Sequence, residues 1–154
     1  MLKRDYAGQN CSIARALELI GERWSLLIVR DCLRGYGRFD QFQASLGIAS
    51  NVLSNRLERL VEVGIIERVR YQQRPDRYEY RLTEMGLELR VALIALMHWG
   101  DRHLAPAGAP VLVEHAGCGG EVTTRLACSE CGAVLEPADI QTRPGPGHRA
   151  PAHA

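Results

Sequence analysis

The clearest chemical pattern in the sequence lies near the C-terminus, where four soft metal ligands occur as two pairs. The pattern is His115-x2-Cys118-x9-Cys128-x2-Cys131, and a glycine follows the last residue of each pair. Imidazole nitrogens and thiolates are ligands that zinc prefers, and four protein ligands complete a closed, structural tetrahedral site. The following glycines permit tight turns that direct backbone amides toward the thiolates. The sequence therefore predicts one structural zinc ion bound by these four residues.

Two other interpretations of this segment stay open. The spacer of nine residues between the pairs is shorter than the roughly 15–20 residues of the common four-cysteine spacing. The pair Cys128-x2-Cys131 is also the pattern of a redox dithiol. A third interpretation is a metal-free flap of three strands at residues 111–113, 121–126 and 134–135. Segments below about 40 residues seldom fold without a metal, a cross-link or docking, which favours zinc.

A second pattern combines hydroxyl, amide and guanidinium side chains on one helix face. Over residues 50–64, Leu53, Leu57 and Leu60 form an apolar stripe, and the opposite face is polar. Amide and guanidinium groups pair with base edges and phosphates. The alternative for the two arginines is a salt bridge that supports the helix, such as Arg59 with Glu62 or Glu58. The candidate DNA-binding residues of this helix are Ser50, Asn51, Asn55, Arg56 and Arg59.

An arginine-rich stretch follows directly. Residues 68–81 hold five arginines against two acids, Asp76 and Glu79. Two runs rich in β-forming residues, 65–71 and 78–82, flank a polar loop, which predicts a β-hairpin. Arginine suits bidentate phosphate contacts, although such residues also form surface salt bridges. We expect the hairpin to contact DNA through Arg70, Arg74 and Arg77, with Gln72 and Gln73 beside them.

Helical periodicity predicts the elements that position these groups. Helices are expected over residues 11–21, 22–33, 38–46, 50–64 and 84–103, with Thr83 capping the last one. Four helices, a hairpin and a helix, with a three-residue turn at 47–49, make a winged helix-turn-helix, which is mainly α with a β-hairpin wing. The expected organisation is a DNA-binding and dimerisation domain over 1–104, a small β-rich appendage over 105–140, and a disordered Pro/Gly/Ala-rich tail over 141–154.

Several features of residues 11–103 occur together. They are Cys11 at the start of the first helix, Trp24 in a Gly-x-x-Trp context, Arg38-Phe39, Leu-Ser-Asn-Arg-Leu at 53–57, Glu79-Tyr80, Leu82-Thr83, and His98-Trp99-Gly100-Asp101 in the last helix. In these features the chain resembles the HxlR family of bacterial winged helix-turn-helix regulators. The resemblance implies a homodimer that binds double-stranded operator DNA, usually as a repressor and sometimes as an activator.

Cys11 is the candidate for redox sensing. Its thiol is expected at a helix N-terminus, with Arg15 one turn on and Lys3 and Arg4 upstream, a setting that lowers a thiol pKa and favours reaction with electrophiles and oxidants. The resemblance implies sensing of quinones, aldehydes or oxidants by a cysteine at this place, with the effector itself unspecified. The alternative is a small buried residue that starts the helix. Cys32 is expected in the core.

Composition excludes several classes of protein. With 154 residues, 46% hydrophobic and 24% charged, the chain fits one globular domain with an appendage. No stretch approaches the ~20 apolar residues of a membrane span, and the start lacks a signal peptide, so we expect a cytoplasmic protein. No phosphate loop or nucleophile elbow supports an enzyme. The alternative to a DNA-binding regulator is a winged-helix protein-interaction module with a structural zinc knuckle and no operator.

Overall fold

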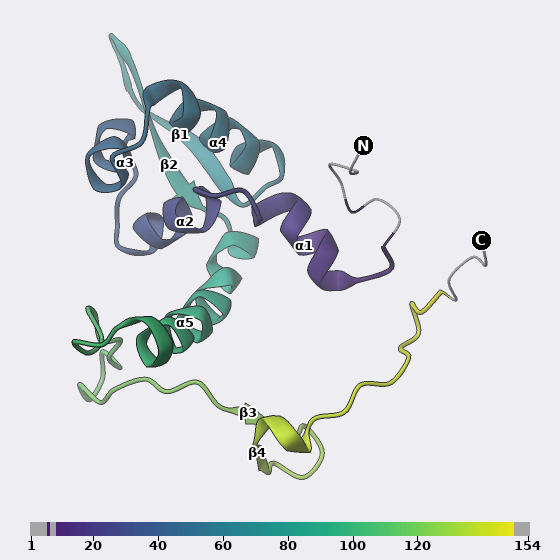
Figure 1. Cartoon of the computed structure of the whole chain (residues 1–154). Coiled ribbons are helices and arrows are strands. Elements are labelled where there is room, and N and C mark those ends of the chain that lie inside the picture. The colour runs from purple at the N-terminus through teal and green to yellow at the C-terminus, as the bar shows by residue number, and fades with distance from the viewer. Residues whose placement is uncertain (1–5, 7–8, 150–154) are drawn as a thin grey trace. The chain divides into compact units, whose positions relative to one another are not determined.

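A computed structural model describes residue 6 and residues 9–149 (Figure 1). Its elements, in order, are α1 (Ser12–Ile20), α2 (Ser25–Leu33), α3 (Phe39–Leu46), α4 (Ser50–Glu62), β1 (Ile66–Gln73), β2 (Asp76–Leu82), α5 (Glu84–Leu104), β3 (Leu126–Ala127), β4 (Val134–Leu135) and a 3-10 turn, η1 (Pro137–Asp139). The sequence from α1 to α5 confirms the predicted winged helix-turn-helix. Along the described residues, no helix combines the length and apolar content needed to cross a membrane.

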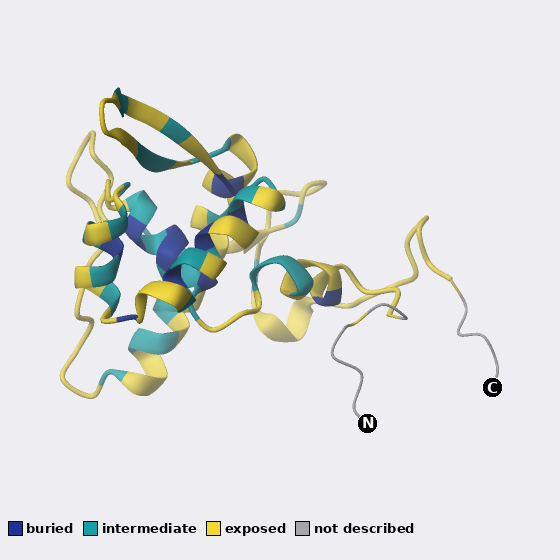
Figure 2. Cartoon of the chain, turned by 90° about the horizontal axis from the view of Figure 1, so that it is seen from above, coloured by how far each residue is buried: buried dark blue, intermediate teal, exposed yellow. Residues whose placement is uncertain are grey.

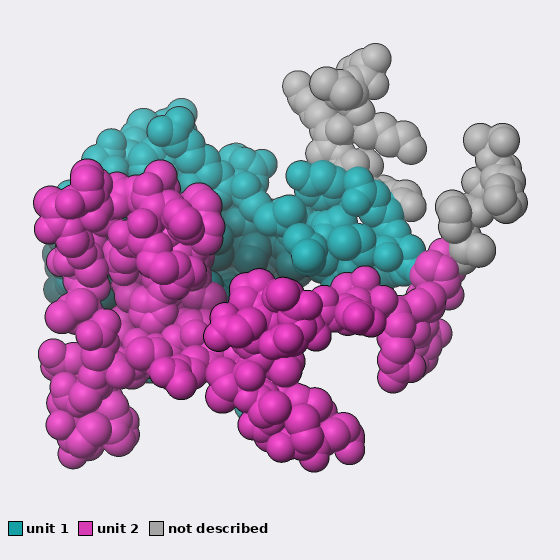
Figure 3. Space-filling view, turned by 60° about the horizontal axis from the view of Figure 1, so that its bottom comes forward, with its two compact units in different colours: residues 1–93 teal, residues 94–154 magenta. Residues whose placement is uncertain are grey.

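Two compact units make up the chain, residues 1–93 and residues 94–154 (Figure 3). The division falls within α5, between Leu93 and Ile94. The long helix therefore supplies its first part to the winged helix and its last part to the C-terminal unit.

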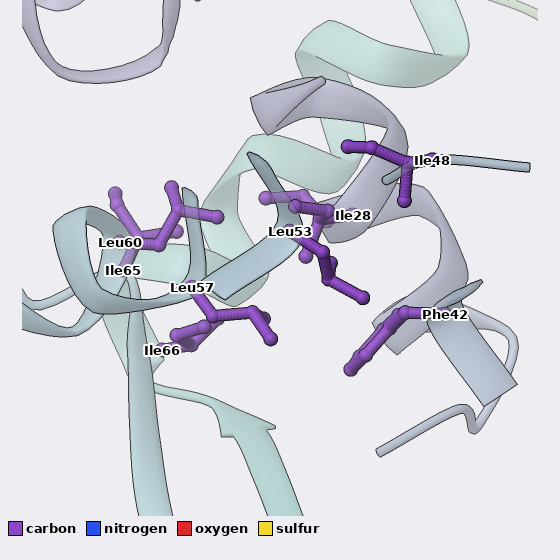
Figure 4. Packing of buried hydrophobic residues seen from close by; sticks show 9 residues of the cluster. Ile28, Phe42, Ile48, Leu53, Leu57, Leu60, Ile65 and Ile66 are labelled. Atoms are coloured by element: carbon purple, nitrogen blue, oxygen red, sulfur yellow. The ribbon is translucent and has the colours of Figure 1, made fainter. Parts of the chain in front are cut away.

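The core of the first unit is an apolar cluster contributed by α2, α3, α4 and the start of β1 (Figure 4). Helix α4 inserts Leu53, Leu57 and Leu60, which are fully buried at the spacing that one helix face requires. The other buried members are Ile28, Val29, Phe42, Ile48, Ile65 and Ile66. Because α4 is held by this stripe, its opposite face lies on the surface of the unit (Figure 2).

The start of α2 differs from the prediction. The helix begins at Ser25 rather than Glu22, and residues 22–24 form a turn in which the Ser25 N–H donates to the Glu22 carbonyl at 3.0 Å. This turn redirects the chain after α1 and lets Trp24 pack against the core cluster. Local periodicity does not reveal such a turn, because Trp24 within it continues the apolar pattern of Leu26 and Leu27 in the helix.

The wing is longer than predicted. Strands β1 and β2 pair antiparallel from Ile66 opposite Leu82 to Gln73 opposite Asp76, with an irregularity between Arg70 and Gln72. Only Arg74 and Pro75 separate the strands. The polar ends pair because backbone hydrogen bonds, rather than a buried face, hold an exposed hairpin together.

The predicted cap of α5 is confirmed. The Thr83 hydroxyl accepts a hydrogen bond from the Gly86 N–H at 3.1 Å and donates to the Gly64 carbonyl at 2.6 Å. A Cβ at residue 86 would lie 2.1 Å from the Ile65 carbonyl oxygen, so only glycine permits this close packing of α5 on the base of the wing. Thr83 thereby ties the wing to the last helix.

The C-terminal unit contains two small hairpins in place of a three-stranded flap. Strand β3 pairs with β4, and a separate bridge joins Glu114 to Glu121. The predicted strand at 121–126 is divided, because its two ends pair with different neighbours. His98 of α5 hydrogen-bonds Thr124 at 2.8 Å, and a cleft of about 270 Å³ lies among residues 97–102, 109–113 and 121–124. Residues 141–149 form no helix or strand, and 150–154 lie outside the described chain.

Candidate nucleic-acid interface

A short turn fixes α4 relative to α3. Helix α3 ends at Gly47, whose φ of 60° is left-handed, and the buried Ile48 anchors the turn in the core. The Gln43 amide donates to the Ser50 hydroxyl at 2.7 Å and joins the two helices across the turn. This is the geometry by which a helix-turn-helix presents its second helix as a rigid unit.

Every exposed residue of α4 is polar. The candidates Ser50, Asn51, Asn55 and Arg59 are all exposed, and Glu58 lies among them. Ala49, which precedes the helix, supplies no side-chain cap. The first-turn amides therefore receive no acceptor from the N-cap side chain, and helix N-termini of this kind favour anions.

Arg56 and Arg59 are both engaged by carboxylates. Arg59 lies 3.4 Å from Glu62, which is the helix-supporting salt bridge that the sequence raised as an alternative. Arg56 pairs with Glu22 at 3.1 Å, and its side chain is only 22% exposed. Its Nε is buried without a hydrogen-bond partner. Arg56 is therefore held toward the protein, whereas Asn51 and Asn55 are free to meet a ligand.

The three wing candidates differ in how they are held. Arg70 lies 3.6 Å from Asp76 and is about half exposed. Arg74 and Arg77 are exposed at the tip and make no ion pair with any described residue. The Gln72 amide donates to the Arg74 carbonyl at 3.0 Å and supports the tip. The tip of the wing thus carries two cations without an ion pair to any described residue, Arg74 and Arg77, where a winged helix meets flanking DNA.

Arg38 is a surface cation that sequence reasoning missed. It precedes α3, and its guanidinium lies 5.2 Å from the centroid of the Tyr71 ring in β1. Within the wing, Arg68 lies 3.7 Å from the centroid of Tyr78. Cation–π contacts of this kind orient an arginine without neutralising it. No sequence signal links Arg38 to Tyr71, because they lie in different elements.

The two cysteines of the winged helix have different environments. Cys11 is exposed and occupies the N-cap of α1, while Lys3 and Arg4, the cations expected upstream of it, lie outside the described residues. Burial, reinforced by the Asp31 charge, raises the pKa of Cys32 to about 12. Cys32 packs against the core cluster as expected and stays a neutral thiol at physiological pH.

The four C-terminal ligand candidates meet within their pairs. His115 Nδ1 lies 3.2 Å from Cys118 Sγ. The pKa of Cys128 is lowered because the amides of Cys131 and Glu130, and then the Cys131 side chain, hydrogen-bond its sulfur. In the part of the chain that the structure describes, no three His, Cys, Asp or Glu side chains are close enough to hold a metal. The two pairs are therefore formed but separate.

Comparisons with known proteins agree with this fold. The family model described as HxlR-like helix-turn-helix matches residues 19–107. The HTH-type transcriptional regulator Rv3095 of Mycobacterium tuberculosis is 47% identical over 140 residues, which cover 90% of this chain and 89% of the relative.

Solved structures extend the comparison. The crystal structure of the transcription factor PA1607 superimposes on this chain with a TM-score of 0.78 at 37% sequence identity. The superposition covers 87% of this chain and 94% of PA1607, so the match continues into the C-terminal unit. The reduced form of the transcriptional regulator YodB from Bacillus subtilis is 29% identical over 64% of this chain and 98% of its own, with a TM-score of 0.54. With its winged helix, its polar α4 face and a family model that covers more than half of its length, this chain belongs to the HxlR-like helix-turn-helix family.

Proposed function

We propose that this protein is a transcriptional regulator that reads operator DNA with α4 and contacts the flanking backbone with the β1–β2 wing. The observation that carries the proposal is the wholly polar exposed face of α4, fixed by the turn at residues 47–49. A helix used for protein docking would be expected to expose apolar anchors. That difference favours DNA over the protein-interaction alternative.

The roles follow from where each side chain lies. Ser50 and Asn51 stand at the α4 N-terminus, where backbone amides and the helix dipole favour a phosphate. Asn55 is one turn further on the exposed face, and its amide suits a bidentate contact with an adenine edge. We assign Arg56 and Arg59 secondary roles because carboxylates already hold them.

We extend the proposal to a homodimer formed through α1 and α5. Val91 and Ile13 are each 71% exposed, which is unusual for large apolar side chains on a regular helix. A two-fold dimer would present two copies of α4 about one DNA turn apart, roughly 34 Å. The exposed large apolar side chains of these two helices are Ile13, Leu17, Met85, Leu87, Val91, Leu96, Trp99 and Leu104.

We further propose a repressor in the bacterial cytoplasm whose DNA binding responds to oxidants or electrophiles at Cys11. The support is the exposed thiol at the start of α1, a helix proposed to form the dimer interface. The similarity to YodB, whose structure is that of a reduced form, is a second support. No catalytic role is assigned to any residue.

The test is a mobility-shift titration of the protein against the DNA upstream of its own gene. We expect saturable binding that Asn55→Ala weakens by about 1–3 kcal/mol, roughly 5- to 150-fold. Gln141→Ala is the matched control, because Gln141 is an exposed amide side chain in the segment after η1, outside the winged helix and the proposed dimer helices. Equal affinities for the wild type and Asn55→Ala, or no preference over unrelated DNA, would favour the protein-interaction module.

A further inference from the structure

The C-terminal unit builds the same turn twice. We call residues 115–120 the first knuckle and residues 128–133 the second knuckle. In the first, the Gly119 N–H donates to the His115 carbonyl at 2.8 Å, and the His115 N–H donates to the Gly120 carbonyl at 2.8 Å. The second repeats both bonds at 2.9 Å, from Gly132 to Cys128 and from Cys128 to Ala133.

The flanking backbone repeats as well. The glycine that follows the fourth residue of each knuckle has a left-handed backbone, with φ of 70° at Gly119 and 71° at Gly132. A residue pair closes each knuckle, Glu114 with Glu121 in the first and Ala127 with Val134 in the second. Two backbone hydrogen bonds, a left-handed glycine and a closing residue pair of the first knuckle therefore recur at the equivalent positions of the second.

The soft ligands occupy the same two positions of each knuckle. The first and fourth residues are His115 and Cys118 in one, and Cys128 and Cys131 in the other. The 3.2 Å separation of His115 Nδ1 and Cys118 Sγ is close to the roughly 3.5 Å between a nitrogen and a sulfur on one tetrahedral zinc ion. The first knuckle thus prearranges two ligands of a four-ligand site, and the second repeats the backbone that does so.

The repeat distinguishes a metal site from a redox dithiol. A dithiol needs two cysteines, but the first knuckle makes the same two backbone hydrogen bonds around a histidine and a cysteine. What the two pairs have in common is the ability to bind a metal, since imidazole and thiolate are both zinc ligands and only thiols form disulfides. The shared backbone therefore points to a shared ion.

We propose that one zinc ion joins the two knuckles of the same chain through His115, Cys118, Cys128 and Cys131. This site goes beyond the proposed DNA binding and does not depend on it. Four protein ligands leave no position for water, so the ion is structural.

The two knuckles must approach one another to share the ion, because the described residues place no three such ligands together. The nine-residue spacer between Cys118 and Cys128 spans at most about 30 Å and is long enough to fold back. Leu126 and Val134 of the second hairpin are 58% and 55% exposed, and this approach would bring them into contact with the rest of the unit. Zinc binding and folding of the segment are then one event.

The first experiment measures zinc in protein purified under reducing conditions from zinc-replete cells. We expect about one equivalent per chain, falling below about a tenth in both His115→Asn and Cys131→Ser, which alter different knuckles. Cys11→Ser is the matched control and keeps its zinc. Circular dichroism of the α1–α5 helices checks that each variant is folded. Less than half an equivalent in the wild type, or loss of zinc in only one knuckle variant, would overturn the shared site.

Thiol alkylation followed by mass spectrometry gives a second readout that needs no variant. In the zinc-loaded protein we expect Cys11 to react and the three knuckle cysteines to be protected. A chelator should expose those three, while the partly buried Cys32 should react more slowly than Cys11 with or without zinc. Equal rates with and without zinc, or a Cys128–Cys131 disulfide in freshly purified zinc-free protein, would overturn the proposal in favour of the dithiol.

Mixing tests whether one chain supplies all four ligands. A variant lacking the first pair, His115→Asn with Cys118→Ser, is refolded with one lacking the second pair, Cys128→Ser with Cys131→Ser. A site within one chain predicts no zinc in the mixture. Recovery of zinc would show that the knuckles meet across two chains and would overturn the same-chain assignment.

Discussion

Arg74 at the tip of the wing is expected to act on DNA through charge alone. It is exposed and makes no ion pair with any described residue, so its guanidinium is available to a phosphate. Phosphate contacts position a protein on DNA without reading sequence. Replacing Arg74 by alanine should therefore weaken binding to operator and unrelated DNA by similar factors.

The magnitude follows from counterion release. Each neutralised phosphate contributes about 0.9 to the slope of log K against log salt, so losing one contact per chain in the proposed dimer makes the slope less negative by about 1.8. Added salt weakens DNA binding by the wild type more than DNA binding by the variant, because the wild type releases more counterions when it binds. Between roughly 50 and 200 mM salt, the wild type should therefore lose about tenfold more affinity than Arg74→Ala.

Fluorescence anisotropy with a labelled duplex, titrated at four or five salt concentrations, measures both slopes. Arg81→Ala is the matched control, because Arg81 is an exposed arginine of the same hairpin but is already held by Glu79. The control should leave the slope nearly unchanged. Equal slopes for the wild type and Arg74→Ala, or an equal change in both variants, would refute the assignment of the wing tip to phosphate.

Three further perturbations test the core, the dimer and the sensor. Leu57→Ala empties a fully buried position under α4 and should lower the free energy of unfolding by about 2–5 kcal/mol in a urea titration; a loss below 1 kcal/mol would mean that the cluster does not anchor the helix. Val91→Asp places a charge on the proposed α5 interface and should give monomers by light scattering at micromolar concentration, whereas an unchanged dimer would move the interface elsewhere. Cys11→Ser should bind operator like the reduced wild type but lose its response to oxidant, and a persisting response would exclude Cys11 as the sensor.

The features that sequence predicted correctly are those set by neighbours along the chain. The stripe of Leu53, Leu57 and Leu60 fixed α4 because helical spacing alone places them on one face. Thr83 was identifiable as a cap because cap and capped amide lie three residues apart. The family resemblance rested on such local signals and is confirmed by the match over residues 19–107.

What the sequence could not supply depends on groups that are distant along the chain. Arg56 was an attractive DNA contact on the polar face of its helix, but Glu22, from the turn before α2, pairs with it. Asp31 is fully buried beside its sequence neighbour Arg30, at 2.7 Å, and its burial also depends on the elements that pack over α2. Neither the Arg56–Glu22 pair nor the burial of Asp31 leaves a periodic signature, because each depends on how elements pack.

The two knuckles also combine a feature that is set locally, the turn, with one that is not, the distance between the turns. Each turn is encoded by a ligand, two intervening residues, a cysteine and a glycine, so sequence alone identified both pairs, and the structure forms both. Whether the pairs meet depends on the path of residues 121–127, which contain no glycine or proline to fix a reversal. A bound metal ion can stabilise a reversal of the chain at these residues, because the free energy of metal binding contributes to folding when no preformed site exists. Zinc content is therefore the measurement that decides the fold of this segment as well as its chemistry.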